Sequence, residues 1–541
     1  MMASTPAWSV AVPSAEDVRL AYVEARAAAM TGDHSRSAAL LASLAQSQPQ
    51  DVDLARKALA EAIGSGQIEL GLKLARTIPT VKLSSEARLL LATDEIRRRQ
   101  LGKAIEWLSL KGDNGDLAFL VPLVNAWEAA ERNDANRALQ AVDAIPANSL
   151  LTPLKAEERA LILLKFRRAA DAEPYARQAL GTAGNREIRL RLAFADGFLA
   201  SGDRTRAAAM VEGISADAWT ARQNILAGRP SGESIDTLSR AMSETIVAFA
   251  SDLIRLQRSA PPIGLVRVAR YADPENGNAS LILALLLDGQ DRSDEALAVL
   301  NTIPRDDALI AQARDATVRI LSDQKRFNEA YAIAAPAASA SDAGPDDYSR
   351  LGDLLAAMKR NKEAADAYGR AIALGNAQGV KADLWSLLLL RASALDQSGQ
   401  WPEAKKALEQ GLAIAPDQPL LLNYLGYGKL ERGEEMDSAE AMIRKASQLA
   451  PDDASITDSL GWAQYKRGKV AEAISTLQVA AEKDPDQAEI QEHLGDALFK
   501  AGRRFEARFA WEAALVTAED DIATRVKAKL VSGLTTANSA P

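Results

Sequence analysis

The chain has 541 residues, of which 48% are hydrophobic but only 5% aromatic. It is too long for one compact core, and its abundance of Ala and Leu favours closely packed helices over strands, which prefer aromatic and β-branched residues. The net charge of −9 argues against nucleic-acid binding, and the absence of Cys excludes disulfides, thiolate catalysis and cysteine-bound zinc.

The first segment, residues 1–14, is small, polar and proline-containing, which predicts a disordered tail. Ser9-Val10-Ala11 has the small-x-small form of a signal-peptide cleavage site, but the basic and apolar parts of a complete signal peptide are not visible. The sequence as it stands predicts a soluble, cytoplasmic protein, or a periplasmic one if a signal peptide is missing from it. No run of about 18 apolar residues occurs, so no membrane span is expected.

From residue 15 to residue 214, apolar residues follow the 3.6-residue period of helices, and turns divide the stretch into about six divergent helix pairs. Several pairs carry two alanines 12 residues apart, at the positions where paired helices approach most closely. These are Ala92 with Ala104, Ala126 with Ala138, Ala160 with Ala172, and Ala195 with Ala207. The pattern predicts degenerate helical repeats.

Residues 215–262 do not follow this repeat. They contain a glycine- and proline-rich loop and then helical sequence, so the segment is either an irregular helical insert or a hinge. The repeat resumes in residues 263–340, where Ala284 and Ala296 again lie 12 residues apart.

The clearest repeats lie in residues 346–519. Leu-Gly pairs recur there near a fixed period, since Gly426 and Gly461 are 35 residues apart and Gly461 and Gly495 are 34 apart. The remaining stretch, 520–541, predicts a closing helix followed by a disordered tail.

A period near 34 with Leu-Gly, a mid-repeat Gly, Ala and a final Pro is the tetratricopeptide pattern. The segments NYLGYGKLERG, DSLGWAQYKRG and HLGDALFKAGRRFEARFAWEAAL resemble the C-terminal repeats of large proteobacterial tetratricopeptide proteins. The resemblance implies an all-α solenoid of helix-turn-helix units wound into a superhelix. Some bacterial relatives of this type are envelope adaptors for a protease, which makes that role one expectation.

No catalytic or metal-binding constellation is recognisable. His34 and His493 are the only histidines, and they lie far apart in a solenoid in which only neighbouring repeats touch. Gly64-x-Gly66 lies in a helix turn and matches neither phosphate-binding fingerprint. We therefore expect no enzyme activity, no cofactor and no metal.

The remaining candidate site is the concave surface of the array. The resemblance implies that the first helix of each pair lines it, at positions that are aromatic, acidic or amide-bearing here. They are Asn423, Tyr427, Asp458, Trp462, Tyr465, Glu492, Asp496 and Phe499. This mixture favours a peptide with apolar anchors and Lys or Arg, and argues against capture of a peptide carboxylate. In the alternative, Trp462 and Tyr465 pack between neighbouring repeats.

The sequence thus predicts a non-enzymatic scaffold or adaptor that binds partner proteins or peptides through its concave surface. In its sharper form the scaffold serves a protease or an envelope assembly. Two alternatives stay open: a self-assembling array, which would be a homo-oligomer, and a regulatory array of an enzyme complex. No nucleic acid is expected as a partner.

Overall fold

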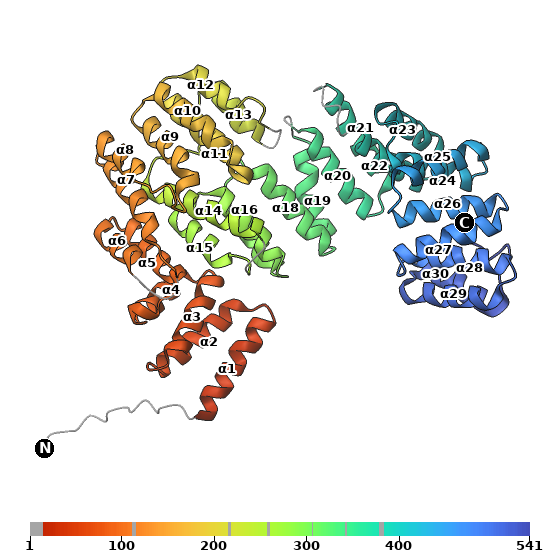
Figure 1. The fold of residues 1–541 in the computed structure, drawn as a ribbon, viewed down its shortest axis with the longest axis horizontal. Coiled ribbons are helices and arrows are strands. Elements are labelled where there is room, and N and C mark those ends of the chain that lie inside the picture. Colours follow the sequence, from red (N-terminus) through yellow and green to blue (C-terminus); the bar gives the residue numbers. More distant parts are fainter. Residues whose placement is uncertain are drawn as a thin grey trace. The chain divides into compact units, whose positions relative to one another are not determined.

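The computed structural model describes residues 15–110, 115–214, 218–256, 260–305, 307–340, 343–377 and 384–540. These residues form helices and no strand, so the all-α fold expected from the sequence is confirmed. The chain divides into two compact units, unit 1 up to Arg326 and unit 2 from Phe327 (Figure 1). The predicted N-terminal tail, residues 1–14, lies outside the described residues.

Unit 1 contains 18 helices and four short 3-10 helices within its described residues. They are α1 (Ala15–Met30), α2 (His34–Ser47), α3 (Val52–Gly64), α4 (Ile68–Ala75), η1 (Thr80–Lys82), α5 (Ser85–Arg97), α6 (Leu101–Ser109), η2 (Ala118–Leu120), α7 (Val121–Glu131), α8 (Ala135–Asp143), η3 (Thr152–Leu154), α9 (Lys155–Lys165), α10 (Ala169–Leu180), η4 (Gly184–Arg186), α11 (Glu187–Ala200), α12 (Arg204–Met210), α13 (Trp219–Leu226), α14 (Leu238–Leu256), α15 (Ile263–Ala272), α16 (Gly277–Asp288), α17 (Ser293–Leu300) and α18 (Ile310–Asp323). From α1 to α12 they form six consecutive pairs, α1 with α2 through α11 with α12.

Small side chains let the two helices of a pair approach closely. The alanines that the sequence places 12 residues apart all have no exposed surface. They are Ala92, Ala104, Ala126, Ala138, Ala160, Ala172, Ala195, Ala207, Ala284 and Ala296. Helix starts are set by capping aspartates: Asp33, Asp134 and Asp203 each accept a hydrogen bond from the backbone N–H three residues on.

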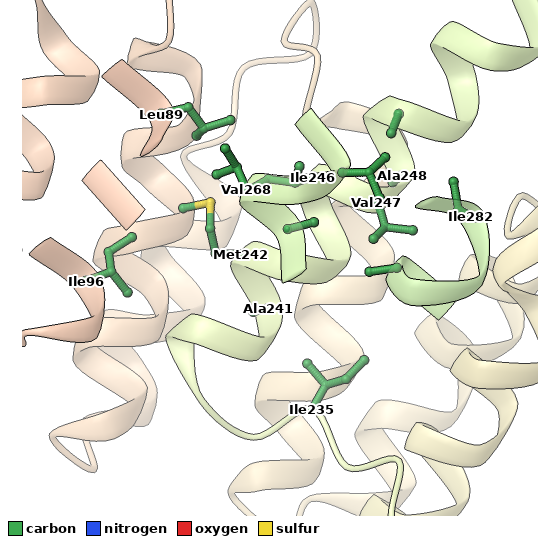
Figure 2. Close-up of a cluster of buried hydrophobic side chains, with 14 of the residues drawn as sticks. Leu89, Ile96, Ile235, Ala241, Met242, Ile246, Val247, Ala248, Val268 and Ile282 are labelled. Atoms are coloured by element: carbon green, nitrogen blue, oxygen red, sulfur yellow. The ribbon is translucent and has the colours of Figure 1, made fainter. Parts of the chain in front are cut away.

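The segment 215–262, which the sequence left open between insert and hinge, holds α13 and α14, and α14 packs inside the repeats. We call the face formed by the first helices of the pairs the inner surface of a unit. In unit 1, α14 contacts α5 and α7, while α15 contacts α3 and α5. Figure 2 shows Leu89 and Ile96 of α5 beside Met242 of α14 and Val268 of α15, all buried. The inner surface of unit 1 is therefore filled by the chain itself.

Buried ion pairs also connect α9 and α11 to the residues that fill the inner surface of unit 1. Two hydrogen bonds of 3.0 and 2.9 Å join Arg186 to Glu157 of α9. Arg189 of α11 donates to Glu244 of α14 and to Glu233 in the loop before it. Charges removed from water need such partners, because an unpaired buried charge costs several kcal/mol, on the order of 3–5. The segment is thus an integral part of unit 1.

Unit 2 is a simple array of pairs with a closing helix. Its helices are α19 (Phe327–Ala338), α20 (Pro345–Ala357), α21 (Asn361–Ala377), α22 (Leu384–Gln397), α23 (Trp401–Ile414), α24 (Pro419–Glu431), α25 (Met436–Leu449), α26 (Ala454–Lys466), α27 (Val470–Lys483), α28 (Ala488–Lys500), α29 (Arg504–Thr517) and α30 (Asp520–Ser532). The pairs run from α20 with α21 to α28 with α29, and α30 packs on α28 and α29. In each pair the packing is between neighbours in sequence, as expected for a solenoid.

Both ends of unit 2 differ from the sequence-based expectation. The unit begins at Phe327, inside the range 263–340 that the sequence grouped together, because α19 packs on α20. Arg360, just before α21, stacks on the Tyr331 ring of α19 at 4.7 Å. At the other end, the tail predicted to be disordered folds back, since Asn538 and Ala540 are 7% and 2% exposed.

Candidate functional site: the inner surface of unit 2

The inner surface of unit 2 carries an open pocket where α24, α26 and α28 follow one another. α24 contacts α26, and α26 contacts α28. The pocket has a volume of about 300 Å³ and is lined by Asp396, Asn423, Tyr424, Tyr427, Gly428, Glu431, Ser455, Asp458, Ser459, Gln487 and Glu489. A wider hollow of about 1030 Å³ shares Gln487 and Glu489 with it and extends to Glu519 and Asp521.

Three of the residues predicted from the sequence meet in this pocket: Asn423 and Tyr427 from α24, and Asp458 from α26. They lie on one face because Asn423 and Tyr427 are four residues apart, and because α26 repeats the same face one helix pair later. Burial raises the pKa of the Tyr427 hydroxyl, and the nearby carboxylates of Glu431 and Glu489 raise it further. The tyrosine is therefore a neutral hydrogen-bonding group at any ordinary pH.

Asp458 connects the pocket to a buried aromatic stack. His493 Nδ1 lies 2.8 Å from one Asp458 oxygen, Oδ2, and the histidine ring stacks on Trp462 at 4.0 Å. Trp462 in turn stacks on Tyr465 at 4.6 Å. Although burial alone would lower the pKa of His493, the Asp458 carboxylate raises it above its ordinary value.

Trp462 is consequently not a contact residue of an open surface, and this corrects the expectation that placed it in the groove. Its side chain is fully buried between α26 and α28. Tyr465, partly exposed, packs on it from the same helix. The alternative interpretation, packing between neighbouring repeats, describes Trp462, because His493 of the next repeat forms one wall of its site.

Glu492 and Asp496 also depart from the expectation, since neither is exposed. Arg525 and Lys529 of α30 bind Glu492, with the shortest distances 2.7 and 2.6 Å. Lys529 reaches Asp496 at 2.8 Å, and Trp511 donates to Asp496 at 2.9 Å. The closing helix α30 occupies the place where the next repeat would pack. These two carboxylates therefore bind α30 and do not face a partner.

The last residues of the chain pass over the same end of the inner surface. The backbone N–H of Ala540 donates to Asp496 at 3.1 Å, and Ala540 belongs to a cluster with Trp462 and Leu430. Gly533 has a positive φ of 76° and lies against the partly exposed Phe499 ring. Phe499 is thus covered in part by the tail and does not line the pocket.

The other eight lining residues were not predicted, and four of them carry a carboxylate or an aromatic ring: Asp396, Tyr424, Glu431 and Glu489. Tyr424 and Glu431 lie on the same helix as Asn423 and Tyr427, beside the predicted positions. Asp396 comes from α22 and Glu489 from the first turn of α28. The excess of carboxylates on the first helices was a usable signal, but the helix ends that bring them into one pocket are set by packing.

The pocket is acidic. Its lining includes four carboxylates and, among the described residues that form it, no Lys or Arg. Arg432 pairs with Asp396 at 2.5 Å and approaches Glu431 at 4.0 Å. Burial raises the pKa of Glu431, an effect that Arg432 offsets in part. The surface therefore presents more negative charge than its own cations neutralise.

Two other features are absent from the described part of the chain. No group of three or more His, Asp or Glu side chains there is placed to hold a metal ion. Within the same residues, no helix combines the length and the apolar character needed to cross a bilayer.

The fold and this surface define a helical-repeat protein built from stacked helix pairs. A family model for the TPR repeat matches residues 461–502, from within α26 to the turn after α28. This part of the chain is therefore a tetratricopeptide repeat (TPR). TPR proteins generally act as non-catalytic scaffolds that bind protein or peptide partners.

Similarity to individual proteins is distant. No curated protein matches the sequence. Among solved structures, the chain is similar to the APC/C hetero-tetramer Cut9–Hcn1, with 15% identity, 97% of each chain covered and a TM-score of 0.36. It is also similar to MamA AMB-1 (21% identity, 33% of this chain and 96% of that one, TM-score 0.25). A third is YrrB, a TPR protein with an unusual peptide-binding site (18% identity, 36% and 97% coverage, TM-score 0.27).

Proposed function

We propose that this protein is a non-enzymatic scaffold that binds a peptide segment of a partner protein on the inner surface of unit 2. The observation that carries the proposal is the open pocket formed by α24, α26 and α28, with Asn423, Tyr427 and Asp458 in its lining. A tyrosine offers a large contact area at low entropic cost, and an asparagine side chain can bond a peptide backbone.

The contrast with unit 1 supports this assignment. There the inner surface is packed against α14 and α15, with buried apolar side chains and ion pairs between them. A partner would have to displace that packing. In unit 2 the corresponding surface is open at the pocket and covered by the chain's own residues at α30 and the tail.

The test begins with peptide selection. Random 12-residue peptides displayed on phage are selected against the full-length chain, and synthetic copies are titrated by fluorescence anisotropy. Tyr427→Ala is expected to weaken binding about thirtyfold, which is the effect of about 2 kcal/mol for a buried aromatic anchor. Phe505→Ala is the matched control, since Phe505 is 74% exposed on the outer helix α29 and lies outside the pocket lining.

Circular dichroism must show both variants folded. Peptides that bind Tyr427→Ala and Phe505→Ala as tightly as the unmodified chain would place the binding surface elsewhere. Affinity capture from the native cell, followed by mass spectrometry, then tests the sharper role as an adaptor for a protease or an envelope assembly, because that role requires such a partner to be retained on the unmodified chain and lost on Tyr427→Ala.

A further inference from the structure

The polar atoms around the pocket of unit 2 are not all satisfied by the chain itself. Asp458 is 5% exposed, and while its Oδ2 pairs with His493, its Oδ1 is buried without a hydrogen bond. Asn423 likewise has a buried side-chain oxygen, Oδ1, without a partner. Both atoms are acceptors and both residues line the pocket. Buried acceptors without a donor are rare, since each costs about 1–3 kcal/mol.

The charges around these acceptors have the same sign. Glu431 and Glu489 line the same pocket, and Glu489 makes no ion pair within the described part of the chain. The adjoining hollow is mixed in charge, since Lys359 and Arg525 line it together with Glu519 and Asp521. A ligand that brings several N–H donors and a positive charge would satisfy the unpartnered oxygens and would also pair with the Glu489 carboxylate.

We propose that this pocket binds the guanidinium group of an arginine side chain in the partner's peptide. This inference rests on the proposed function, and it specifies the side chain by which the bound peptide is recognised. A guanidinium is planar and carries five N–H donors in a rigid fork, whereas a lysine ammonium is a point charge with three. The pocket offers acceptors on two successive inner helices, from Asn423 and Asp458, and the rings of Tyr424 and Tyr427 for stacking.

The acceptors come from different side chains, so a forked donor fits the site better than a single ammonium. Arginine also loses less hydration on burial than lysine. This suits the Asp458 carboxylate, which is only 5% exposed. Complementary charge further speeds the encounter with a basic segment, an effect that salt weakens.

The test uses three pools of fluorescein-labelled nonapeptides with mixed flanking residues and a fixed central residue. The central residue is arginine, lysine, or citrulline, which has the shape of arginine without its charge. The probe is added to the full-length chain and followed by anisotropy. The arginine pool is expected to bind at least tenfold more tightly than the citrulline pool, with the lysine pool between them.

Variants identify the pocket as the source of this preference. Asp458→Asn and Glu489→Gln should each reduce the arginine-to-citrulline ratio to less than threefold. Glu482→Gln is the matched control, because it removes one carboxylate from the exposed end of α27, outside the pocket lining, and should leave the ratio unchanged. If Asp458→Asn fails to fold, the arginine-to-citrulline ratios of Glu489→Gln and Asn423→Ala decide whether the pocket is the source of the preference.

Equal binding of the arginine and citrulline pools, or a preference that survives in the folded pocket variants, would overturn the proposal, and a lysine pool as tight as the arginine pool would overturn the choice of guanidinium. The proposed function fails separately. If Tyr427→Ala weakens all pools alike while arginine and citrulline bind equally, the peptide-binding surface stands and the arginine pocket does not.

Discussion

Gly461 lies where α26 and α27 approach most closely, and its missing side chain is a requirement of the packing. A Cβ built at this position would lie 2.6 Å from Leu477 Cγ and 3.3 Å from the Leu477 backbone nitrogen. Gly461→Val should therefore destabilise unit 2 by about 1–3 kcal/mol, the usual cost of overpacking. Urea unfolding followed by circular dichroism measures this difference.

The control for this substitution is Gly102→Val. Gly102 is exposed in α6, and a Cβ there meets no atom within 4 Å. The same change in side chain should alter the free energy of unfolding by less than about 0.5 kcal/mol. Equal effects at the two positions would mean that close packing is not what Gly461 provides.

Glu158 makes the stability of unit 1 depend on pH. Burial and the neighbouring Glu157 charge raise the pKa of Glu158 from 4.5 to about 8, although Trp127 donates to it at 2.6 Å. The folded state thus keeps a proton that the unfolded state releases above about pH 4.5. Stability from this group is fully present below that pH and is lost as the pH rises through 8.

Glu158→Gln removes the titration and can still accept the hydrogen bond from Trp127. Calorimetry should find the Tm of unit 1 similar to that of the unmodified chain near pH 5, and higher than it near pH 8.5. Glu106→Gln, at an exposed position in α6, should leave the pH dependence unchanged. An unchanged slope in Glu158→Gln would show that another group is responsible.

The amino-acid sequence predicted where the two helices of a pair approach closely. It predicted the turns between them less well. The paired alanines are all fully buried because their small size is visible in the sequence and has one common cause. The turn inside each pair needs a residue with positive φ, which glycine supplies in α26–α27 and α28–α29. In the pairs α5–α6, α7–α8 and α9–α10 the same conformation is adopted by Arg99, Asn133 and Arg167. Those repeats therefore look degenerate, although their turns have the same geometry.

Among the elements, α14 is the one whose place could not be predicted. Its apolar residues indicate a helix, but the partners of that helix, α5 and α7, lie more than 100 residues earlier. Ile246 of α14 has no exposed surface (Figure 2). Ile246→Ala should destabilise unit 1 by about 2–5 kcal/mol through lost burial and a new cavity.

Leu256→Ala on the same helix is the comparison, because Leu256 is 50% exposed and its truncation should cost less than about 0.5 kcal/mol. Both changes are measured by chemical unfolding of the full-length chain. Similar losses for the two variants would contradict the packing of α14 inside unit 1.

The candidate site also combines positions that the local repeat spacing predicts with contacts that depend on residues far away in the sequence. Asn423, Tyr427 and Asp458 follow from the repeat spacing, because each sits on a first helix at a position that recurs. Glu492 and Asp496 have the same spacing but lie under α30, whose Arg525 and Lys529 neutralise them. The array register specifies which face a side chain is on, and the closing helix decides whether that face remains open.

At the scale of the whole molecule, the two compact units are expected to unfold separately. Scanning calorimetry of the full-length chain should resolve two transitions. Gly461→Val should lower the temperature of one, and Ile246→Ala should lower the other. A single transition shifted by both variants would show that the chain unfolds as one cooperative body.

The self-filled inner surface of unit 1 also has a consequence for biosynthesis. The chain emerges from the ribosome at about 5–20 residues per second, so the apolar faces of α3, α5 and α7 are made on the order of ten seconds before α14 and α15 arrive to cover them. During that interval unit 1 is open to aggregation and to chaperones. The helix pairs of unit 2 avoid most of this delay, because each packs on one already made, and the part that waits is the surface that α30 and the tail cover.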